Sequence, residues 1–345
     1  MTKKKVAIIG AGQVAEKVHI SYYRTREEID LVAAVSPNFE RVKAFAERNG
    51  IPNYYTNEDD MYIAEKPDIV SICTPNKFHY ENVIKALENG CDVICEKPPA
   101  ISAEEAHEMK RVAEKNNCLL TYDFHHRFAD DVKILKEKVL DGVLGDIYVV
   151  KVKALRRCGI PGWGTFTNKE VQGGGPLIDL GIHMLDAALH VMDFPKVESV
   201  TAKMFQKIGT KKSYGTLGEW NPDKFGVEDS LFGFIELEGG RLIQIETSFA
   251  LNMKETSIMN VEFYGDQAGA TLFPAQIYKD EKGKLVSLLN REEADPERHQ
   301  KSMAAFVDKC LGEDVMVANA EQGYIIQKIV EALYQSAEKG ERISL

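Results

Sequence analysis

The chain has 345 residues, of which 44% are hydrophobic and 28% are charged, as expected of an ordinary globular protein with about two domains. Its 43 Lys and Arg residues against 53 Asp and Glu residues give a net charge of −10. This balance excludes a dedicated nucleic-acid-binding protein, which needs a basic face, but a small dinucleotide can still bind through local backbone geometry. No apolar run approaches the roughly 18 residues of a membrane span, so we expect no membrane partner.

The N-terminus and the cysteines favour a cytoplasmic protein. Lys3, Lys4 and Lys5 precede an apolar run, but Gln13 and Glu16 cut that run short, so we expect no export signal. The six cysteines are scattered, and no His/Cys pair follows at the spacing of a zinc site. We therefore expect free thiols in a reducing compartment.

Short apolar runs alternate with helical patterns in the N-terminal part of the chain. The runs are apolar throughout, which favours parallel strands covered on both faces, and they span residues 4–10, 31–36, 68–74, 91–97 and 118–124. Apolar residues recur at helical spacing between them, at residues 39–50, 79–90 and 102–117. This alternation predicts an α/β fold with a doubly wound sheet.

The second half of the chain carries longer runs in which apolar and polar residues partly alternate. Such runs predict an antiparallel sheet that is open on one face, with strands at residues 147–157, 197–208, 229–238, 241–251 and 257–265. Turns are expected at 238–240 and 265–267. Helices are expected near residues 176–192, 296–312 and 320–338. Composition changes near residues 125–145, which we predict to hold the domain boundary.

A glycine-rich segment, Gly10-Ala11-Gly12-Gln13-Val14-Ala15, follows the first predicted strand and opens a helix. This is the context of a dinucleotide-binding fingerprint. Gly10 permits a tight turn, Gly12 lets the backbone approach a pyrophosphate, and Ala15 allows close packing of helix on strand. The alternative is a glycine turn without a ligand. We predict that Gly10, Gly12, Gln13 and Val14 bind NAD or NADP.

The end of the second strand bears on the choice between the two nucleotides. A carboxylate there would hold the adenosine ribose, but the sequence has Ser36-Pro37-Asn38. Arg41 could meet a 2′-phosphate, whereas Ser36 and Asn38 can bond a plain ribose, and Asn38 can instead cap the next helix. The choice stays open, with a slight preference for NAD.

Two further segments, Thr74-Pro75-Asn76 and Glu96-Lys97-Pro98, lie at the ends of predicted strands. They are expected at the carboxyl edge of the sheet, where ligands bind. Lys97 lies between a buried strand and a Pro-Pro break, which makes it a candidate electrostatic group; the alternative is an ordinary surface lysine. The predicted cofactor-binding residues of these segments are Thr74, Pro75, Asn76, His79, Glu96 and Lys97.

A glycine-led helix at residues 173–192 contains Asp179 and His183. Four helical residues advance about 400°, so both side chains share one face. A carboxylate beside a histidine can raise its basicity and orient it, as a proton-abstracting pair requires. The alternative is a charged stripe on a helix, continued by Asp186 and His190.

These motifs together resemble the Gfo/Idh/MocA oxidoreductases, the glucose-fructose oxidoreductase and inositol dehydrogenase group. The resemblance rests on GxGxxA at 10–15, TPNxxH at 74–79, EKP at 96–98 and GGGxxxDxGxHxxD at 173–186. It covers nearly the whole chain. It implies a Rossmann dinucleotide-binding domain at residues 1–125.

The resemblance further implies a C-terminal α+β domain at residues 126–345, with a large, mostly antiparallel, open-faced sheet. That domain would bind substrate and pair subunits into a homodimer or homotetramer. The implied reaction is hydride transfer between nicotinamide and a secondary alcohol of a sugar, glycoside or cyclitol. His183 would take the hydroxyl proton, Lys97 would stabilise charge on the substrate oxygen, and Asp179 would hold the substrate or tune the other two.

The substrate-binding residues are expected to include Arg127, Arg156 and Trp163. Arg127 corresponds to a family position near the active site, and the other two precede the glycine-led helix as in members that act on sugars. Trp163 can stack on a pyranose or pack within its loop. The pair Arg156-Arg157 could also favour a carboxylated or phosphorylated sugar.

Two other functions stay open. One is a glycosidase that retains NAD and oxidises its substrate transiently. The other is a dinucleotide sensor, against which the presence of Lys97, Asp179 and His183 counts. We expect no metal, because His125 and His126 are adjacent and adjacent side chains on a strand face opposite ways.

Overall fold

The computed structural model describes residues 3–345. It contains two compact units, one of Met1–Asp123 with His299–Gln327 and the other of Phe124–Arg298 with Lys328–Leu345. The division into domains 1–125 and 126–345 stays a prediction, and the compact units differ from it because residues 299–327 return to the first unit. No helix in this described part of the chain is long and apolar enough to cross a membrane.

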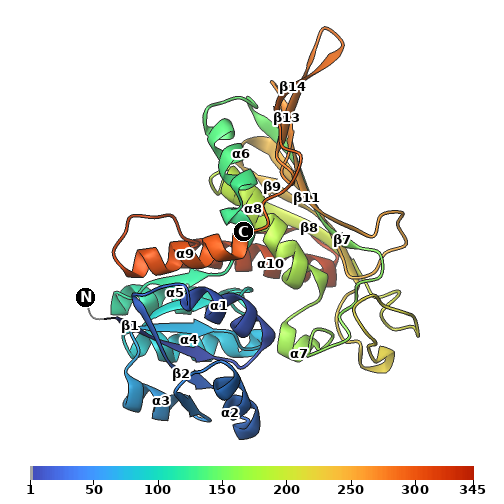
Figure 1. The fold of residues 1–345 in the computed structure, drawn as a ribbon. Helices are drawn as coiled ribbons and strands as arrows, with labels where there is room; N and C mark the ends of the chain where they lie inside the picture. The colour runs from blue at the N-terminus through green and yellow to red at the C-terminus, as the bar shows by residue number, and fades with distance from the viewer. Residues whose placement is uncertain (1–2) are drawn as a thin grey trace. The chain divides into compact units, whose positions relative to one another are not determined.

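The first unit contains a six-stranded parallel sheet in the order β3-β2-β1-β4-β5-β6 (Figure 1). Its strands are β1 Lys4–Ile9, β2 Ile29–Val35, β3 Asn53–Tyr55, β4 Ile69–Ile72, β5 Asp92–Cys95 and β6 Leu120–Tyr122. The predicted doubly wound sheet is confirmed. The strand order reverses between β1 and β4, and ligands bind at such a point in open α/β sheets.

Helices separate these strands. They are η1 Ala15–Ile20, α1 Ser21–Tyr23, α2 Phe39–Arg48, α3 Glu58–Glu65, η2 Asn76–Phe78, α4 His79–Glu88 and α5 Ala103–Asn116. Ser102 caps α5 by accepting a hydrogen bond from the Glu105 amide at 3.2 Å, as its capping-box spacing requires. The chain returns to this unit in α9 Arg298–Cys310 and in the first part of α10 Ala320–Lys339.

The second unit contains a nine-stranded sheet in the order β14-β13-β12-β11-β7-β10-β9-β8-β15. Its strands are β7 Ile147–Arg156, β8 Val197–Phe205, β9 Ser230–Leu237, β10 Arg241–Ser248, β11 Ser257–Gly265, β12 Gly269–Thr271, β13 Gln276–Glu281, β14 Lys284–Asn290 and β15 Ile343–Ser344. Neighbouring strands are antiparallel except for β7 and β10, which are parallel. The mostly antiparallel sheet is confirmed.

The helices of this unit are η3 His125–Phe128, α6 Asp130–Leu140, α7 Lys169–Gln172, η4 Leu177–Gly181, α8 Ile182–Val191, η5 Pro222–Lys224, η6 Glu238–Gly240 and the last part of α10. Of these, η4 and α8 pack on one face of the sheet. Every residue of α8 is buried, and it packs on β7 and β11. The opposite face carries the exposed ring of Phe234 and the ion pair of Lys153 with Glu262. This face is open in the chain, as predicted.

Candidate active-site residues

The glycine turn after β1 has the geometry that a bound pyrophosphate needs. Gly10 has a φ of +108°, and a Cβ atom there would lie 2.5 Å from the Cys73 backbone, so only glycine fits. A Cβ atom on Gly12 would meet nothing within 4 Å, which leaves space above the turn. Gln13 and Val14 begin the helix behind it. The residues present therefore fit a dinucleotide at this turn.

The end of β2 is held by backbone contacts and a helix cap. The Ser36 amide donates to the Tyr55 carbonyl at 3.1 Å, and Asn38 accepts from the Arg41 amide at 2.9 Å. Asn38 therefore caps α2, which is one of the two roles considered for it from the sequence. Its contact with the ribose stays a prediction. The Arg41 Nε donates to the Ala11 carbonyl at 3.1 Å, which places the guanidinium beside the glycine turn.

We expect Arg41→Ala to weaken NADPH binding by roughly tenfold or more while changing NADH binding little. A charge-assisted hydrogen bond to the 2′-phosphate is worth about 1.5–3 kcal/mol, and NADH lacks that phosphate. Fluorescence titration of the protein with NADPH and with NADH measures the ratio of the two dissociation constants. Lys43→Ala, a charge change on the exposed side of the same helix, is the control. Equal weakening of both nucleotides would contradict a role in selectivity.

The ends of β4 and β5 are tied together by His79. The imidazole is fully buried, with Nε2 2.9 Å from the Thr74 carbonyl and Nδ1 2.7 Å from the Pro98 carbonyl. Both ring nitrogens face backbone carbonyls inside the unit, and the contact of His79 with the cofactor stays a prediction. Pro75 and Asn76 begin η2 at the carboxyl edge of the sheet.

Glu96 is paired with a buried histidine, and its contact with the cofactor stays a prediction. Its Oε1 lies 3.1 Å from Nε2 of the buried His19, whose Nδ1 lies 3.1 Å from the Ser71 hydroxyl. Burial alone would lower the pKa of His19, but neighbouring Cys73 and Glu96 outweigh it and raise the pKa well above its usual value. The next residue, half-buried Lys97, is joined to Pro98 by a cis peptide bond. A rigid buried network therefore supports the lysine.

In the second unit, the glycines before η4 are held by a buried carboxylate. Glu228 accepts from the amide of Gly175 at 2.9 Å, from that of Leu177 at 3.3 Å and from the Tyr334 hydroxyl at 2.9 Å. Side chains at Gly174 and Gly175 would collide with Tyr334 and Glu228. Burial raises the pKa of Glu228, although these hydrogen bonds oppose the rise. The sequence analysis missed this residue, which positions the start of the helix.

The predicted helix with Asp179 and His183 is present, but its first turn is π-helical. The Ile182 amide donates to the Leu177 carbonyl, five residues back. Such turns are frequent at functional sites. Asp179 is partly exposed, and His183 is 6% exposed. Burial lowers the pKa of Arg156, and the negative charge of Asp179 opposes this shift.

His183 belongs to a cluster of three imidazoles. Its ring centroid lies 4.7 Å from that of His125 and 5.0 Å from that of His126. The two adjacent histidines lie on a 3₁₀ helix rather than a strand, so the reason given above for expecting no metal is wrong. Their donor atoms and that of His183 lie within 4.8 Å of one another, close enough to hold a metal ion. The absence of a metal stays a prediction.

Arg127 forms a buried ion pair with Asp186, and its contact with substrate stays a prediction. Its side chain and that of Asp186 are 0% exposed, and the Arg127 Nε donates to Asp186 at 3.0 Å beside a second bond from Nη2. The guanidinium lies 5.8 Å from the Phe124 ring and 5.4 Å from the Phe194 ring. Burial raises the pKa of Asp186, and Arg127 opposes the rise. The pair anchors α8.

His190 lies one turn after Asp186 on α8, and we expect its burial to make the protein less stable in acid. Burial lowers its pKa from 6.5 to about 2, and the charges of Arg127 and Lys136 add to the effect. Below about pH 6.5 the unfolded chain therefore protonates this imidazole, whereas the folded chain keeps it neutral. The free energy of unfolding is unaffected above about pH 6.5 and decreases below it, by at most about 1.4 kcal/mol per pH unit.

Urea unfolding between about pH 7 and pH 5 measures this slope. We expect His190→Gln to make the loss of stability with falling pH shallower than in the unaltered protein. His107→Gln changes an exposed histidine and is the matched control. An unchanged slope in His190→Gln would contradict the assignment.

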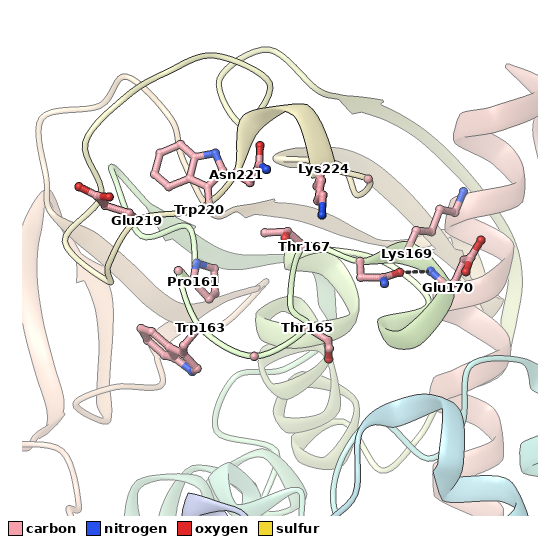
Figure 2. Close-up of a pocket in the computed structure, with 14 residues that line it drawn as sticks. Pro161, Trp163, Thr165, Thr167, Lys169, Glu170, Glu219, Trp220, Asn221 and Lys224 are labelled. Carbon is pink, nitrogen blue, oxygen red and sulfur yellow. Dashed lines mark hydrogen bonds between the residues drawn. The ribbon is translucent and has the colours of Figure 1, made fainter.

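Trp163 is 54% exposed and lies on a loop between β7 and α7, where its ring is 6.3 Å from that of Phe166. It lines a cavity together with residues from the segment before β9 (Figure 2). Arg157, next to Arg156, donates to the Lys254 carbonyl at 2.8 Å.

Both parts of the chain match one family. Residues 4–124 match the oxidoreductase family with an NAD-binding Rossmann fold, and residues 136–345 match the C-terminal alpha/beta domain of the same family. The chain belongs to the Gfo/Idh/MocA oxidoreductase family. The resemblance drawn from its motifs is confirmed, and this Gfo/Idh/MocA protein is an NAD-binding oxidoreductase.

Several relatives of this family member carry names for sugar chemistry. The chain is 59% identical to a D-glucoside 3-dehydrogenase of Escherichia coli (strain K12) over 341 residues, which cover 99% of this chain and 97% of the relative. It is 34% identical over 215 residues to a glucose-6-phosphate 3-dehydrogenase of Bacillus subtilis (strain 168), over 61% and 60% of the two chains. The fold is shared with a levoglucosan dehydrogenase in complex with NADH and levoglucosan, with a TM-score of 0.83 at 20% identity over 99% of each chain.

Proposed function

We propose that the protein is an NAD⁺-dependent dehydrogenase that oxidises the C3 hydroxyl of a D-glucoside to a ketone. The observation that carries this proposal is the 59% identity to the D-glucoside 3-dehydrogenase of Escherichia coli over almost the full length of both chains. The second relative, at lower identity and coverage, is also named for position 3 of a glucose ring. A sugar dehydrogenase is the function that the motifs predict.

In this proposal His183 is the general base. It takes the proton of the C3 hydroxyl as the C–H bond of that carbon breaks and the C–O bond becomes double. The flanking rings of His125 and His126 hold the imidazole in place. Asp179 holds a neighbouring sugar hydroxyl, and the positive charge of Arg156 favours the ionised form of that carboxylate. Nicotinamide, when bound, accepts the hydride.

Lys97 has the electrostatic role. Its ammonium group donates a hydrogen bond to the substrate oxygen and stabilises the negative charge that develops there. The contacts that support this role all lie within the first unit. The His79 link and the pair of Glu96 with His19 fix the backbone on both sides of the lysine, so its position costs little reorganisation during the reaction.

The proposal extends to assembly and location. The open sheet face presents Phe234 and neighbouring half-buried side chains, and we infer that it pairs subunits into a homodimer or homotetramer. All six cysteines are free, as a reducing compartment such as the cytoplasm allows.

The test is an assay of nucleotide reduction with a panel of sugars. Methyl and aryl D-glucosides, disaccharides, glucose 6-phosphate and inositols are each mixed with NAD⁺ or NADP⁺. We expect reduction with D-glucosides and NAD⁺, and a primary isotope effect with substrate deuterated at C3 only. Oxidation of inositols alone, or an isotope effect at another carbon, would overturn the proposal. Release of aglycone without net reduction would establish the NAD-retaining glycosidase instead.

A further inference from the structure

The second unit contains a cavity of about 690 Å³ that the proposed reaction does not use. This volume is within the range of small-molecule sites, about 300–1,000 Å³. Residues 161–170 form one side and residues 219–226 form the other (Figure 2). All of its lining belongs to the second unit.

The two sides of the cavity are joined at both ends. The Gly162 amide donates to the Leu217 carbonyl, and the Gly226 amide donates to the Thr167 carbonyl, each at 2.9 Å. A Cβ atom on Gly162 would lie 2.5 Å from the Gly218 backbone, so glycine is required for this close approach. The Trp220 indole is anchored by a 2.7 Å hydrogen bond to the Gly209 carbonyl. The cavity is therefore a built feature of the fold.

The lining has the chemistry of a carbohydrate site. Both tryptophans of the chain, Trp163 and Trp220, line the cavity. Aromatic faces stack on the C–H faces of sugar rings, and hydroxyl groups need both donors and acceptors around them. Thr165 and Asn168 contribute a hydroxyl and an amide NH₂ as donors, since their oxygens already accept from Gln172 at 2.7 Å and from the Glu170 amide at 3.0 Å, and Glu170 and Glu219 contribute acceptors.

The charges of the lining favour a neutral polyol over an anion. Lys169 and Lys224 are balanced by Glu170 and Glu219. Lys169 is also paired with Glu338, outside the lining, at 2.9 Å. A phosphate or carboxylate ligand would require a surplus of cations, which these residues do not provide.

Backbone hydrogen bonds connect the cavity to the helical turn that carries Asp179. The Gly173 amide donates to the carbonyl of Lys169, a residue of the lining, at 2.8 Å, and the Asp179 amide donates to the Gly175 carbonyl at 3.0 Å. On the other side, Arg156 donates to the Gly159 carbonyl at 3.4 Å. Pro161, two residues further along the same loop, is the first residue of the lining. The loop therefore leads from the neighbourhood of Asp179 to the cavity.

We propose that this cavity binds the aglycone part of a glycoside, in particular a second sugar ring, while the ring to be oxidised is held at Asp179 and His183. This inference rests on the proposed function and specifies its substrate as a disaccharide or a similarly extended D-glucoside. It assigns Trp163 to the aglycone and not to the ring that reacts.

Intrinsic fluorescence tests the site directly, because every tryptophan of the chain lines the cavity. The protein is titrated with a D-glucosyl disaccharide, with methyl D-glucoside and with glycerol. Each titration is carried out without nucleotide and with saturating NADH, neither of which permits oxidation. We expect a saturable change with the disaccharide and a much smaller one with methyl glucoside. No change with the disaccharide in either titration would overturn the subsite, even if the protein is an active dehydrogenase.

Kinetics of Trp163→Ala supply the second test. We expect KM for the disaccharide to rise about tenfold while KM for methyl glucoside changes less than about twofold, since one stacked ring is lost only from the longer substrate. Trp163→Phe should recover most of the loss. Tyr214→Ala changes an 80% exposed side chain that does not line the cavity and is the control. Equal rises for both substrates would overturn the assignment. If no glycoside is oxidised at all, the proposed function fails, and the titration still decides whether the cavity binds sugar.

Discussion

Replacing His183 by asparagine is expected to lower kcat by about 10²–10⁴-fold, the usual contribution of a positioned general base. The side chain is 6% exposed and lies between two other imidazoles, so asparagine fits the space without supplying a base. Sugar and nucleotide contacts remain, and KM should change little. Steady-state kinetics with the substrate found in the sugar panel measure both parameters.

The pH profile distinguishes a base from a merely structural residue. The unaltered enzyme should lose kcat in acid as the base becomes protonated, and His183→Asn should lose that acidic limb. His190→Asn, a change of another buried histidine on the same helix, serves as the control and should retain the limb. An acidic limb that persists in His183→Asn would assign proton abstraction to another residue.

Replacing Arg127 by methionine is expected to destabilise the protein by about 3–5 kcal/mol, because it leaves a buried carboxylate without its partner. Both side chains of the pair are 0% exposed, so water cannot take the place of the guanidinium. Urea unfolding of the purified variants measures the change. Protein that remains folded should keep its KM for substrate, since Arg127 is directed at Asp186 and not at the sugar.

A double variant separates loss of the pair from loss of packing. Arg127→Met combined with Asp186→Leu removes both charges and should recover much of the stability that Arg127→Met alone loses. Destabilisation that is additive in the double variant would show that the residues do not act as a pair. A large rise in KM in folded Arg127→Met would indicate that Arg127 contacts the substrate directly.

Local sequence patterns predicted most of the elements, because burial on both faces of a strand or on one face of a helix leaves a periodic trace. The glycine turn was predictable for the same reason, since Gly10 and Gly12 meet steric demands of that turn itself. β3 and β12 were missed because they are short, and β13 and β14 were missed because few of their residues are buried, so none of them shows the apolar pattern of a buried strand in the sequence. The parallel pairing of β7 with β10 depends on a long connection and leaves no local signal.

The direction of individual side chains was predicted less well. Position at the end of a strand indicated His79 and Glu96 as cofactor contacts, but each finds a buried partner inside the first unit. Arg127 meets a carboxylate 59 residues away, and Glu228 meets a tyrosine 106 residues away. Such partners are set by tertiary packing, so spacing along the chain does not reveal them. The four-residue spacing of Asp179 and His183 did predict that both lie on one helical segment.

The return of residues 299–327 to the first unit has a consequence for protein synthesis. Met303, Phe306 and Val307 belong to the same core as Val6 and Ile8 of β1. The Tyr122 amide donates to the Ala318 carbonyl at 3.0 Å, which joins the end of the sheet to the same returning segment. A ribosome that has reached residue 298 has made every strand of the dinucleotide-binding sheet but none of these core residues. We therefore expect a stop codon that removes residues 299–327 to abolish nucleotide binding at the opposite end of the chain.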